Sequence, residues 1–205
     1  MKTNYKIIMD RALESIRLSG ARPSLLLHAC CAPCSTAVLE ILDKYFELTI
    51  YFYNPNISPE KEYFFRLDEL KKLLPRMGVG DIDVVSPEYD ATIFEETAKG
   101  LEDAPEGGER CRRCYRLRLE STMSYAAENG FDYVTTTLSV SPHKRADWLN
   151  EIGMELEEKY GVRYLASDFK KGDGYKRSCV LSAEYELYRQ NYCGCIYSKV
   201  EAEKR

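Results

Sequence analysis

The chain has 205 residues and a net charge of −4, and 44% of its residues are hydrophobic. This length suits one α/β domain over residues 1–205, and the hydrophobic content excludes a disordered or fibrous chain. No apolar run is long enough to cross a bilayer, and the N-terminus MKTNYKIIMDRALESI lacks the features of an export signal. We therefore expect a cytoplasmic protein without membrane contacts, and the charge argues against nucleic-acid binding through bulk charge alone.

Helix and strand patterns alternate along the chain. Helices are expected over residues 5–18, after Ser35, and over residues 59–74, 115–128 and about 144–160. Strands are expected over residues 24–28, 48–53, 82–85, 132–137 and 162–165. Residues 95–109 are acidic and end in two glycines, which predicts a loop. This alternation predicts an α/β fold with a single doubly wound parallel sheet.

Two of the connecting loops should meet at one rim of this sheet. The sequence ACCAPC at 29–34 follows the first strand, and LSVSPH at 138–143 follows the fourth. Ligands of doubly wound sheets bind beyond the carboxyl ends of the strands. We therefore expect cysteine-rich loops at these carboxyl ends to form a shared site.

Cysteines are the most unusual feature of the composition. Seven of the eight lie in three close groups: Cys30, Cys31 and Cys34; Cys111 and Cys114; and Cys193 and Cys195. In a chain without an export signal, a reducing cytosol favours metal binding or redox chemistry over a disulfide framework. Cys179 has no close neighbour and is expected to pack as a core residue.

The close groups allow several chemistries. Cys111 and Cys114 lie at an expected helix start, where the helix dipole and nearby arginines should lower the pKa of their thiols. Together with the group at Cys30 they could hold zinc or an iron–sulfur cluster, or act in thiol–disulfide exchange. Cys193 and Cys195 could form a strained disulfide, share a metal, or be two partly buried free thiols.

Basic and aromatic residues surround these groups. Five arginines cluster around the second group: Arg110, Arg112, Arg113, Arg116 and Arg118. They could hold RNA phosphates, or form a solvated helix face that is balanced by the acids of residues 95–109. Of the two histidines, His143 is the better candidate for a polar contact or proton transfer. Tyr185, Tyr188 and Tyr192 have helical spacing, which predicts a helix that leads into Cys193.

Six motifs in chain order resemble the QueH type of epoxyqueuosine reductase. They are HACCAPC at 28–34, YNPN at 53–56, CRRC at 111–114, TTLSVSPHK at 136–144, DFKK at 168–171 and YELYRQNYCGC at 185–195. The resemblance covers about residues 24–198 and implies a fold akin to HUP-type, Rossmann-like α/β domains. It also implies an enzyme that reduces epoxyqueuosine to queuosine at the wobble position of tRNA, without cobalamin. Cysteines stand where related ATP-cleaving enzymes carry their phosphate loop, so ATP use is not expected.

The resemblance also assigns site residues by position. It implies a [4Fe-4S] cluster with the ligands Cys30, Cys31, Cys111 and Cys114, whereas the CxxC spacing of Cys31 and Cys34 keeps Cys34 as an additional candidate ligand. It implies that Cys193 and Cys195 are catalytic, as a redox-active pair or as ligands of a second metal ion, iron or zinc. The expected substrate-binding residues are His143, Arg112, Arg113, Lys144 and Asp168.

The two cysteine functions complement each other chemically. Removal of an epoxide oxygen takes two electrons and two protons, whereas a cluster delivers electrons singly. The pair, or a second metal, would supply the other electron or polarise the C–O bond. The residues do not identify the electron donor. The alternatives are a zinc-stabilised RNA-binding module without catalysis and a cytosolic thiol–disulfide reductase with a low-pKa thiol at Cys111.

Overall fold

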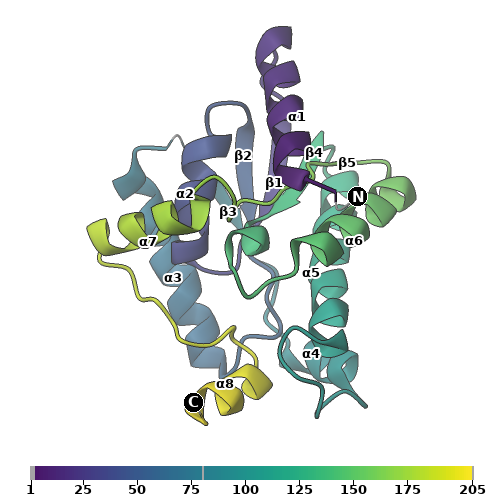
Figure 1. The fold of residues 1–205 in the computed structure, drawn as a ribbon, viewed down its shortest axis with the longest axis vertical. Helices are drawn as coiled ribbons and strands as arrows, with labels where there is room; N and C mark the ends of the chain where they lie inside the picture. The colour runs from purple at the N-terminus through teal and green to yellow at the C-terminus, as the bar shows by residue number, and fades with distance from the viewer. Residues whose placement is uncertain (1–2, 80, 205) are drawn as a thin grey trace.

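The centre of the molecule is a five-stranded, all-parallel sheet (Figure 1). The computed structural model describes residues 3–79 and 81–204, so the ends of the expected 1–205 domain and residue 80 lie outside the described residues. The strands are β1 (Ser24–His28), β2 (Glu47–Tyr51), β3 (Asp83–Val85), β4 (Tyr133–Thr136) and β5 (Arg163–Tyr164). Their order is β3-β2-β1-β4-β5, so the direction of succession reverses between β1 and β4. Sheets of this kind bind ligands in the crevice at that point.

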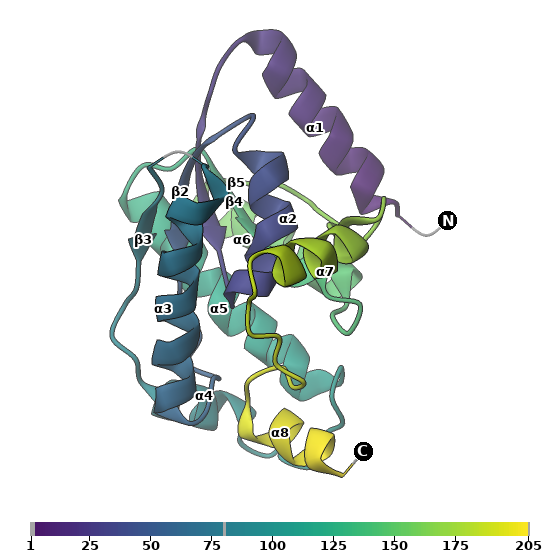
Figure 2. The ribbon, with the colours of Figure 1, turned by 90° about the vertical axis from the view of Figure 1, so that its left-hand side faces the viewer.

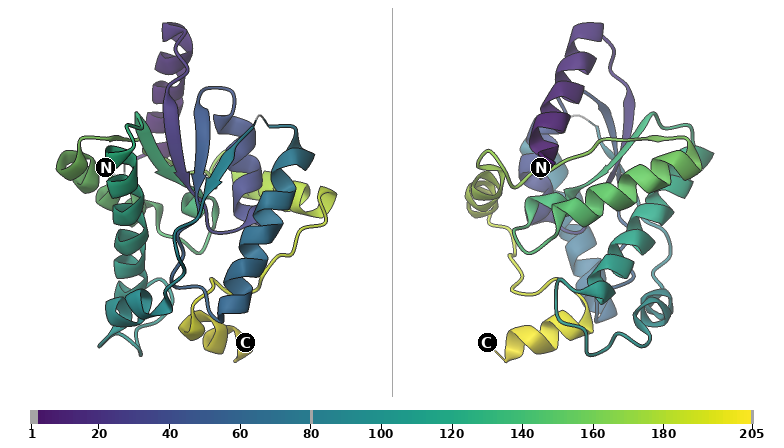
Figure 3. Two further views of the ribbon diagram at one scale, coloured as in Figure 1. Left: turned by 180° about the vertical axis from the view of Figure 1, so that it is seen from behind. Right: turned by 45° about the vertical axis from the view of Figure 1, so that its right-hand side comes forward.

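Helices cover both faces of the sheet (Figures 2 and 3). One face packs against α1 (Tyr5–Ser19), α2 (Ala32–Leu42) and α3 (Glu60–Met77), and the other against α5 (Glu109–Glu128) and α6 (Ala146–Tyr160). The remaining helical segments are α4 (Ala91–Ala98), η1 (Thr137–Val140), α7 (Gly174–Glu184) and α8 (Ile196–Glu203). The predicted α/β fold with a doubly wound parallel sheet is confirmed. No described helix is long and apolar enough to span a membrane.

Strand β1 shows why both faces must be covered. Leu25 and Leu27 belong to the core under α1, α2 and α3, whereas Leu26 belongs to the core under α5 and α6. Successive side chains of a strand point to opposite faces, and all three leucines are fully buried. A strand that is apolar on both sides needs a layer of helices on each side.

Helix α2 begins earlier than the sequence predicts. Its first residue is Ala32, with Cys31 at the N-cap and Pro33 in the first turn, where the missing N–H of proline is tolerated. Ser35 is therefore not a cap, and its hydroxyl donates to the Cys31 carbonyl oxygen (2.8 Å). As a consequence, Cys34 lies within the first turn of α2 instead of in the loop.

The acidic stretch is only partly a loop. Asp90 caps the start of helix α4 by accepting a hydrogen bond from the Thr92 N–H (2.9 Å), and the helix continues to Ala98. The prediction of a loop over residues 95–109 is thus wrong for its first four residues and for Glu109, which begins α5.

The predicted tyrosine-lined helix is absent from the described chain. Helix α7 ends at Glu184, because Glu186 adopts a left-handed conformation (φ 54°) and the Leu187 N–H returns to the Ser182 carbonyl (2.8 Å). This is a Schellman-type helix end. Residues 185–195, which we call the strap, therefore cross the molecule as irregular chain and carry Cys193 to the site.

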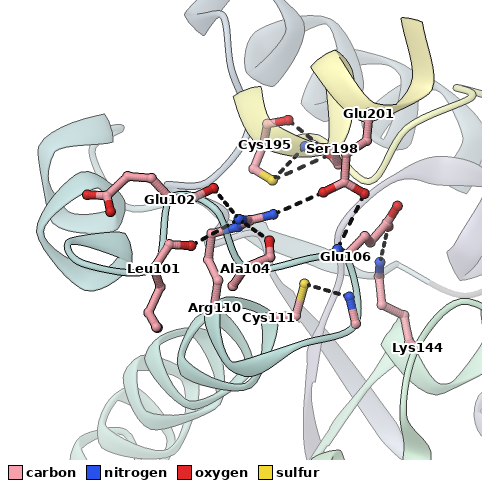
Figure 4. Close-up of polar contacts among 11 residues, drawn as sticks. Leu101, Glu102, Ala104, Glu106, Arg110, Cys111, Lys144, Cys195, Ser198 and Glu201 are labelled. Atoms are coloured by element: carbon pink, nitrogen blue, oxygen red, sulfur yellow. Dashed lines mark hydrogen bonds and ion pairs between the residues drawn. The ribbon is translucent and has the colours of Figure 1, made fainter. Parts of the chain in front are cut away.

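A buried arginine holds the start of α5 against α8 (Figure 4). The Nη1 group of Arg110 donates to three carbonyl oxygens of the preceding loop, those of Leu101, Glu102 and Ala104. Its Nη2 lies 3.4 Å from Glu201 Oε1, and its guanidinium stacks on the Tyr197 ring at 4.3 Å. Arg110 is thus structural, and it cannot take part in a solvent-facing phosphate contact.

This function of Arg110 can be measured directly. Arg110→Met should lower the free energy of unfolding by about 2–4 kcal/mol, because three partly buried hydrogen bonds and the ion pair with Glu201 are lost. Urea unfolding checks this, with Arg113→Met as the control, since Arg113 is exposed on the same helix and should change stability by about 0.5 kcal/mol or less. Equally small effects of both substitutions would contradict the structural role.

Candidate functional site

His28 joins the loops that leave β1, β2 and β4. Its Nδ1 lies 2.9 Å from Thr136 Oγ1, and its Nε2 lies 3.1 Å from the Tyr53 carbonyl oxygen. The carbonyl can only accept, so Nε2 carries the proton and Nδ1 accepts from the Thr136 hydroxyl. Burial lowers the pKa of His28 to about 3, so the ring is neutral at physiological pH. His28 therefore has a structural function at the rim of the sheet.

The first cysteine group forms a compact set of thiols directly after β1. The sulfur atoms of Cys30, Cys31 and Cys34 all lie within 4.8 Å of one another. Asn54, in the loop after β2, holds this turn by donating from Nδ2 to the Ala29 carbonyl oxygen (2.8 Å). Cysteine sulfurs this close together can bind a metal ion.

These three thiols differ in acidity. Hydrogen bonds from Cys31 and Cys34 hold the pKa of Cys30 well below its usual value, and the nearby Arg118 charge adds to this effect. Donating to Cys30 raises the pKa of Cys31 to about 12. The group therefore carries its negative charge on Cys30, and binding of a metal would release the remaining protons.

The CxxC group lies in the first two turns of α5. Burial raises the pKa of Cys111, although its sulfur accepts a hydrogen bond from the Gly107 N–H (3.3 Å, Figure 4). Burial also raises the pKa of Cys114 to about 12. The predicted lowering of these two pKa values is wrong, because desolvation outweighs the helix terminus and the nearby arginines. The low-pKa thiol expected at Cys111 for a thiol–disulfide reductase is not found.

The strap brings the third group next to the CxxC. Cys193 and Cys195 share with Cys111 and Cys114 a narrow gap of about 10 Å³. Cys195 is the N-cap of α8, where its sulfur accepts from the Ser198 N–H (3.4 Å, Figure 4). All eight cysteines lie in the described chain, and each is a free thiol.

Contacts on both sides of the third group hold the strap in place. The Gly194 carbonyl oxygen accepts from the Ser58 N–H (2.9 Å), and the Cys193 carbonyl oxygen accepts from Arg66 Nη1 (3.2 Å). Gly194 itself has φ 133°, and an added Cβ would lie 3.0 Å from Ile57. Glycine is therefore required between the two cysteines by backbone conformation and by space.

A pocket of about 220 Å³ opens beside these groups at the rim between β1 and β4. Its lining comes from the loops after β1 and β4, from α5 and α7, and from the strap, and it includes Cys30, Cys34, Lys144, Tyr175, Arg189, Tyr192 and Cys193. Cys193 and Arg118 border both this pocket and the gap next to the CxxC. The structure thus holds Cys30, Cys31 and Cys34 in one group, lines the gap with the other four cysteines of the three groups, and places Arg118 and Cys193 where pocket and gap meet.

Two of the predicted substrate-binding residues border the pocket, and a third does not. His143 is exposed and borders the pocket, as does the buried Lys144, whose Nζ lies 3.4 Å from Glu106 Oε1 (Figure 4). Burial disfavours the charge of Lys144, but Cys193, Tyr115 and Glu106 together outweigh burial and raise the pKa of Lys144 well above the usual value. Asp168 is buried in ion pairs with Lys170 (2.9 Å) and Lys171 (3.4 Å) and does not border the pocket.

The cluster of five arginines divides into buried and exposed members. Arg110 and Arg118 are buried, whereas Arg116 pairs with Glu155 on α6. Arg112 lies over the Trp148 ring at 5.6 Å, and Arg113 is exposed. Arg113 is therefore the most accessible of the five to a large anionic ligand, and Arg112 and Arg116 are partly accessible.

Three residues of the site were not identified by our sequence reasoning. Asn56 borders the gap. The one signal that could have identified it is its place in the motif YNPN, which resembles the family. Arg66 lies in a charged helix, where its sequence context is that of a solvated surface residue. Glu106 belongs to the acidic loop and gives no separate signal. Tertiary contacts alone identify the last two.

Cys179 differs from its prediction as well. It lies on α7 and is half-buried, so it is not a fully buried core residue. It does not border the pocket or the gap.

Comparison with known proteins identifies the family. The family model described as epoxyqueuosine reductase QueH matches residues 25–201. The epoxyqueuosine reductase QueH of Streptococcus pyogenes is 40% identical over 96% of this chain and 78% of its own length. The proteins of that name from Staphylococcus epidermidis (40% identical, 98% of this chain, 86% of that protein) and Thermotoga maritima (36%, 89% and 93%) are similar too. The chain therefore belongs to the QueH family of epoxyqueuosine reductases.

Proposed function

We propose that this chain reduces epoxyqueuosine to queuosine in tRNA, acting in the cytoplasm as one domain, 1–205, that carries an iron–sulfur centre. Family membership makes the chain an oxidoreductase and argues against a purely structural zinc module. The structural observation that supports the site is the pocket of about 220 Å³ that Cys30, Cys34 and Cys193 all border. It lies where the order of strands reverses, which is where such sheets bind ligands.

The donor set suits a [4Fe-4S] cluster. Such clusters are held by cysteine thiolates, and the proposed ligands are Cys30, Cys31, Cys111 and Cys114. Cys34 is an additional candidate, because its sulfur lies within 4.8 Å of those of Cys30 and Cys31. When bound, a cluster supplies single electrons, which come from a donor that is yet to be identified.

The pair in the strap would complete the electron count. Removing the epoxide oxygen consumes two electrons and two protons and yields an alkene and water. Cys193 borders the pocket, whereas Cys195 is buried behind it with its sulfur against Ser198. As a dithiol the two would supply both electrons and both protons by forming a disulfide, which electrons from the donor must then reduce again. Alternatively, they could hold a second metal ion, iron or zinc, that polarises the C–O bond, and both electrons would then come singly from the donor.

Lys144 is the proposed partner of the epoxide oxygen. Its ammonium group is charged and borders the pocket next to Cys193. Nζ can therefore donate a hydrogen bond, and then a proton, as the oxygen leaves. His143, at the open side of the pocket, and Tyr192 would orient the modified base.

The function is tested by incubating the anaerobically purified protein with epoxyqueuosine-containing tRNA and a chemical reductant. Nucleoside mass spectrometry should show conversion to queuosine through loss of one oxygen atom. Iron-replete, reduced protein that leaves the nucleoside unchanged would contradict the proposal.

The ligand assignment predicts the effects of single serine substitutions. Replacing Cys30, Cys31, Cys111 or Cys114 should remove the visible absorbance of the centre and abolish activity, because each loses a thiolate ligand. Cys179→Ser should change neither, since Cys179 borders neither the pocket nor the gap. If Cys34→Ser bleaches the protein while Cys30→Ser keeps a full centre, the assignment of Cys30 is wrong.

The strap pair should be required for turnover but not for the cluster. Cys193→Ala and Cys195→Ala should keep the visible absorbance and tRNA binding, yet convert no epoxyqueuosine. Metal analysis separates the two versions, since a second-metal site predicts one further metal per chain that both variants lose. Full activity of the double variant would remove the pair from the mechanism.

The exposed arginines should act in tRNA binding alone. The double variant Arg112→Glu, Arg113→Glu should weaken tRNA binding and flatten its salt dependence, because two phosphate contacts are lost. Its iron content should remain that of the wild type. A tRNA affinity and salt dependence equal to the wild type would show that these arginines are only a solvated helix face.

A further inference from the structure

Three fully buried polar side chains around the cysteines have unpartnered atoms. Asn56, Arg66 and Arg118 are 2%, 1% and 1% exposed. Among the described residues, nothing bonds to Arg66 Nη2, Arg118 Nη2 or either side-chain polar atom of Asn56. More than nine in ten buried polar groups of native proteins are bonded, so this concentration in one place requires an explanation.

The free atoms of the two arginines have fixed directions. Arg66 donates from Nε to Glu62 (2.8 Å) and from Nη1 to the Cys193 carbonyl oxygen (3.2 Å). Arg118 donates from Nε to the Cys114 carbonyl oxygen (3.3 Å) and from Nη1 to Asn54 Oδ1 (3.3 Å). In each planar guanidinium, Nε and Nη1 donate to protein acceptors, and Nη2 is the nitrogen without a hydrogen-bond partner among the described residues.

Two of these residues border the space that the cysteines share, and the third lies beside them. Arg118 borders both the pocket with Cys30 and Cys193 and the gap with Cys114. Asn56 borders the same gap. It also lies beside Arg66, because a Cβ on Gly194 would be 3.2 Å from Arg66 Nη1 and 3.5 Å from Asn56 Nδ2.

Arg118 has no carboxylate to balance its charge. None of the ion pairs within residues 3–79 and 81–204 includes it, whereas Arg66 is paired with Glu62. A buried cation is expensive unless an anion lies next to it. Burial works against the charge of Arg118, and Cys114, Cys193, Cys30 and Tyr115 raise its pKa in spite of it. No carboxylate is among these groups, so thiols and a phenol are what surrounds the cation.

We propose that Arg118, assisted by Asn56 and Arg66, donates N–H groups to sulfur atoms of the cysteine-held centre and thereby raises its reduction potential. This inference rests on the proposed function. Hydrogen bonds to sulfur and a nearby positive charge stabilise the more negative, reduced state of an iron–sulfur centre. Arg118 is thus a positioning and tuning residue that makes the centre easier to reduce by its donor.

The test is an anaerobic redox titration of the full-length Arg118→Gln protein, followed by EPR, with iron and sulfide measured per chain. The reduction potential should fall while the iron content stays unchanged. At a fixed applied potential, the ratio of reduced to oxidised centres should drop about tenfold, which equals 59 mV for a one-electron couple. Arg118→Lys, which keeps the charge but not the planar fork, should give a smaller drop.

The matched control is Arg113→Gln, which removes an exposed arginine from the same helix and should leave the ratio unchanged. An iron-replete Arg118→Gln protein that titrates like the wild type overturns the inference. Weaker tRNA binding with an unchanged potential also overturns it, because Arg118 would then serve a substrate phosphate.

A second variant decides the question if Arg118→Gln assembles no centre. Asn56→Leu removes an amide donor and no charge, so it should lower the same ratio about threefold, and an unchanged ratio contradicts the inference. A wild-type protein without redox-active iron would contradict the proposed function as well. If the wild-type protein converts epoxyqueuosine but the variants keep its reduction potential, only the tuning function of Arg118 is contradicted.

Discussion

The neutral, buried ring of His28 fixes the strand ends from which the site is built. It accepts from Thr136 at the end of β4 and donates to the Tyr53 carbonyl after β2, while it ends β1 itself. Asn54 extends this connection, because it bonds to Ala29 on one side and to Arg118 on the other. The cysteine turn after β1 and the buried arginine of α5 therefore have one common support.

Charge inside the site is opposite in sign to that of the whole chain. The chain has a net charge of −4, yet Arg66, Arg118 and Lys144 are buried next to thiols. Two of these cations have acidic partners, Glu62 and Glu106, whereas none of the described ion pairs includes Arg118, which lies among thiols, Asn54 and Tyr115. Thiolates and a cluster bound by them are strongly anionic, and buried cations stabilise such a group where water cannot. This arrangement agrees with the binding of an anionic metal centre better than with a set of separate thiols.

The sequence predicts β1 with its observed bounds, because a fully apolar run is followed directly by a cysteine turn. It does not predict the strap. The spacing of Tyr185, Tyr188 and Tyr192 is helical, but the left-handed Glu186 ends α7 before them, and non-glycine residues rarely signal such a conformation. The raised pKa of Cys111 also cannot be predicted from neighbouring residues in the sequence, since it results from burial, which tertiary packing determines. Motif order identifies the cysteine groups, but only the folded chain shows that Arg118 lies between them.

The central claim is that the rim of the sheet holds an iron–sulfur centre bound by cysteines from separate segments. The most direct measurement is the iron, acid-labile sulfide and zinc content of the anaerobically purified protein, with Mössbauer spectroscopy to identify the cluster type. A [4Fe-4S] cluster predicts about four sulfide and about four iron per chain, with about one further iron or zinc if Cys193 and Cys195 hold a second metal. Colourless protein with about one zinc per chain and no sulfide would contradict it.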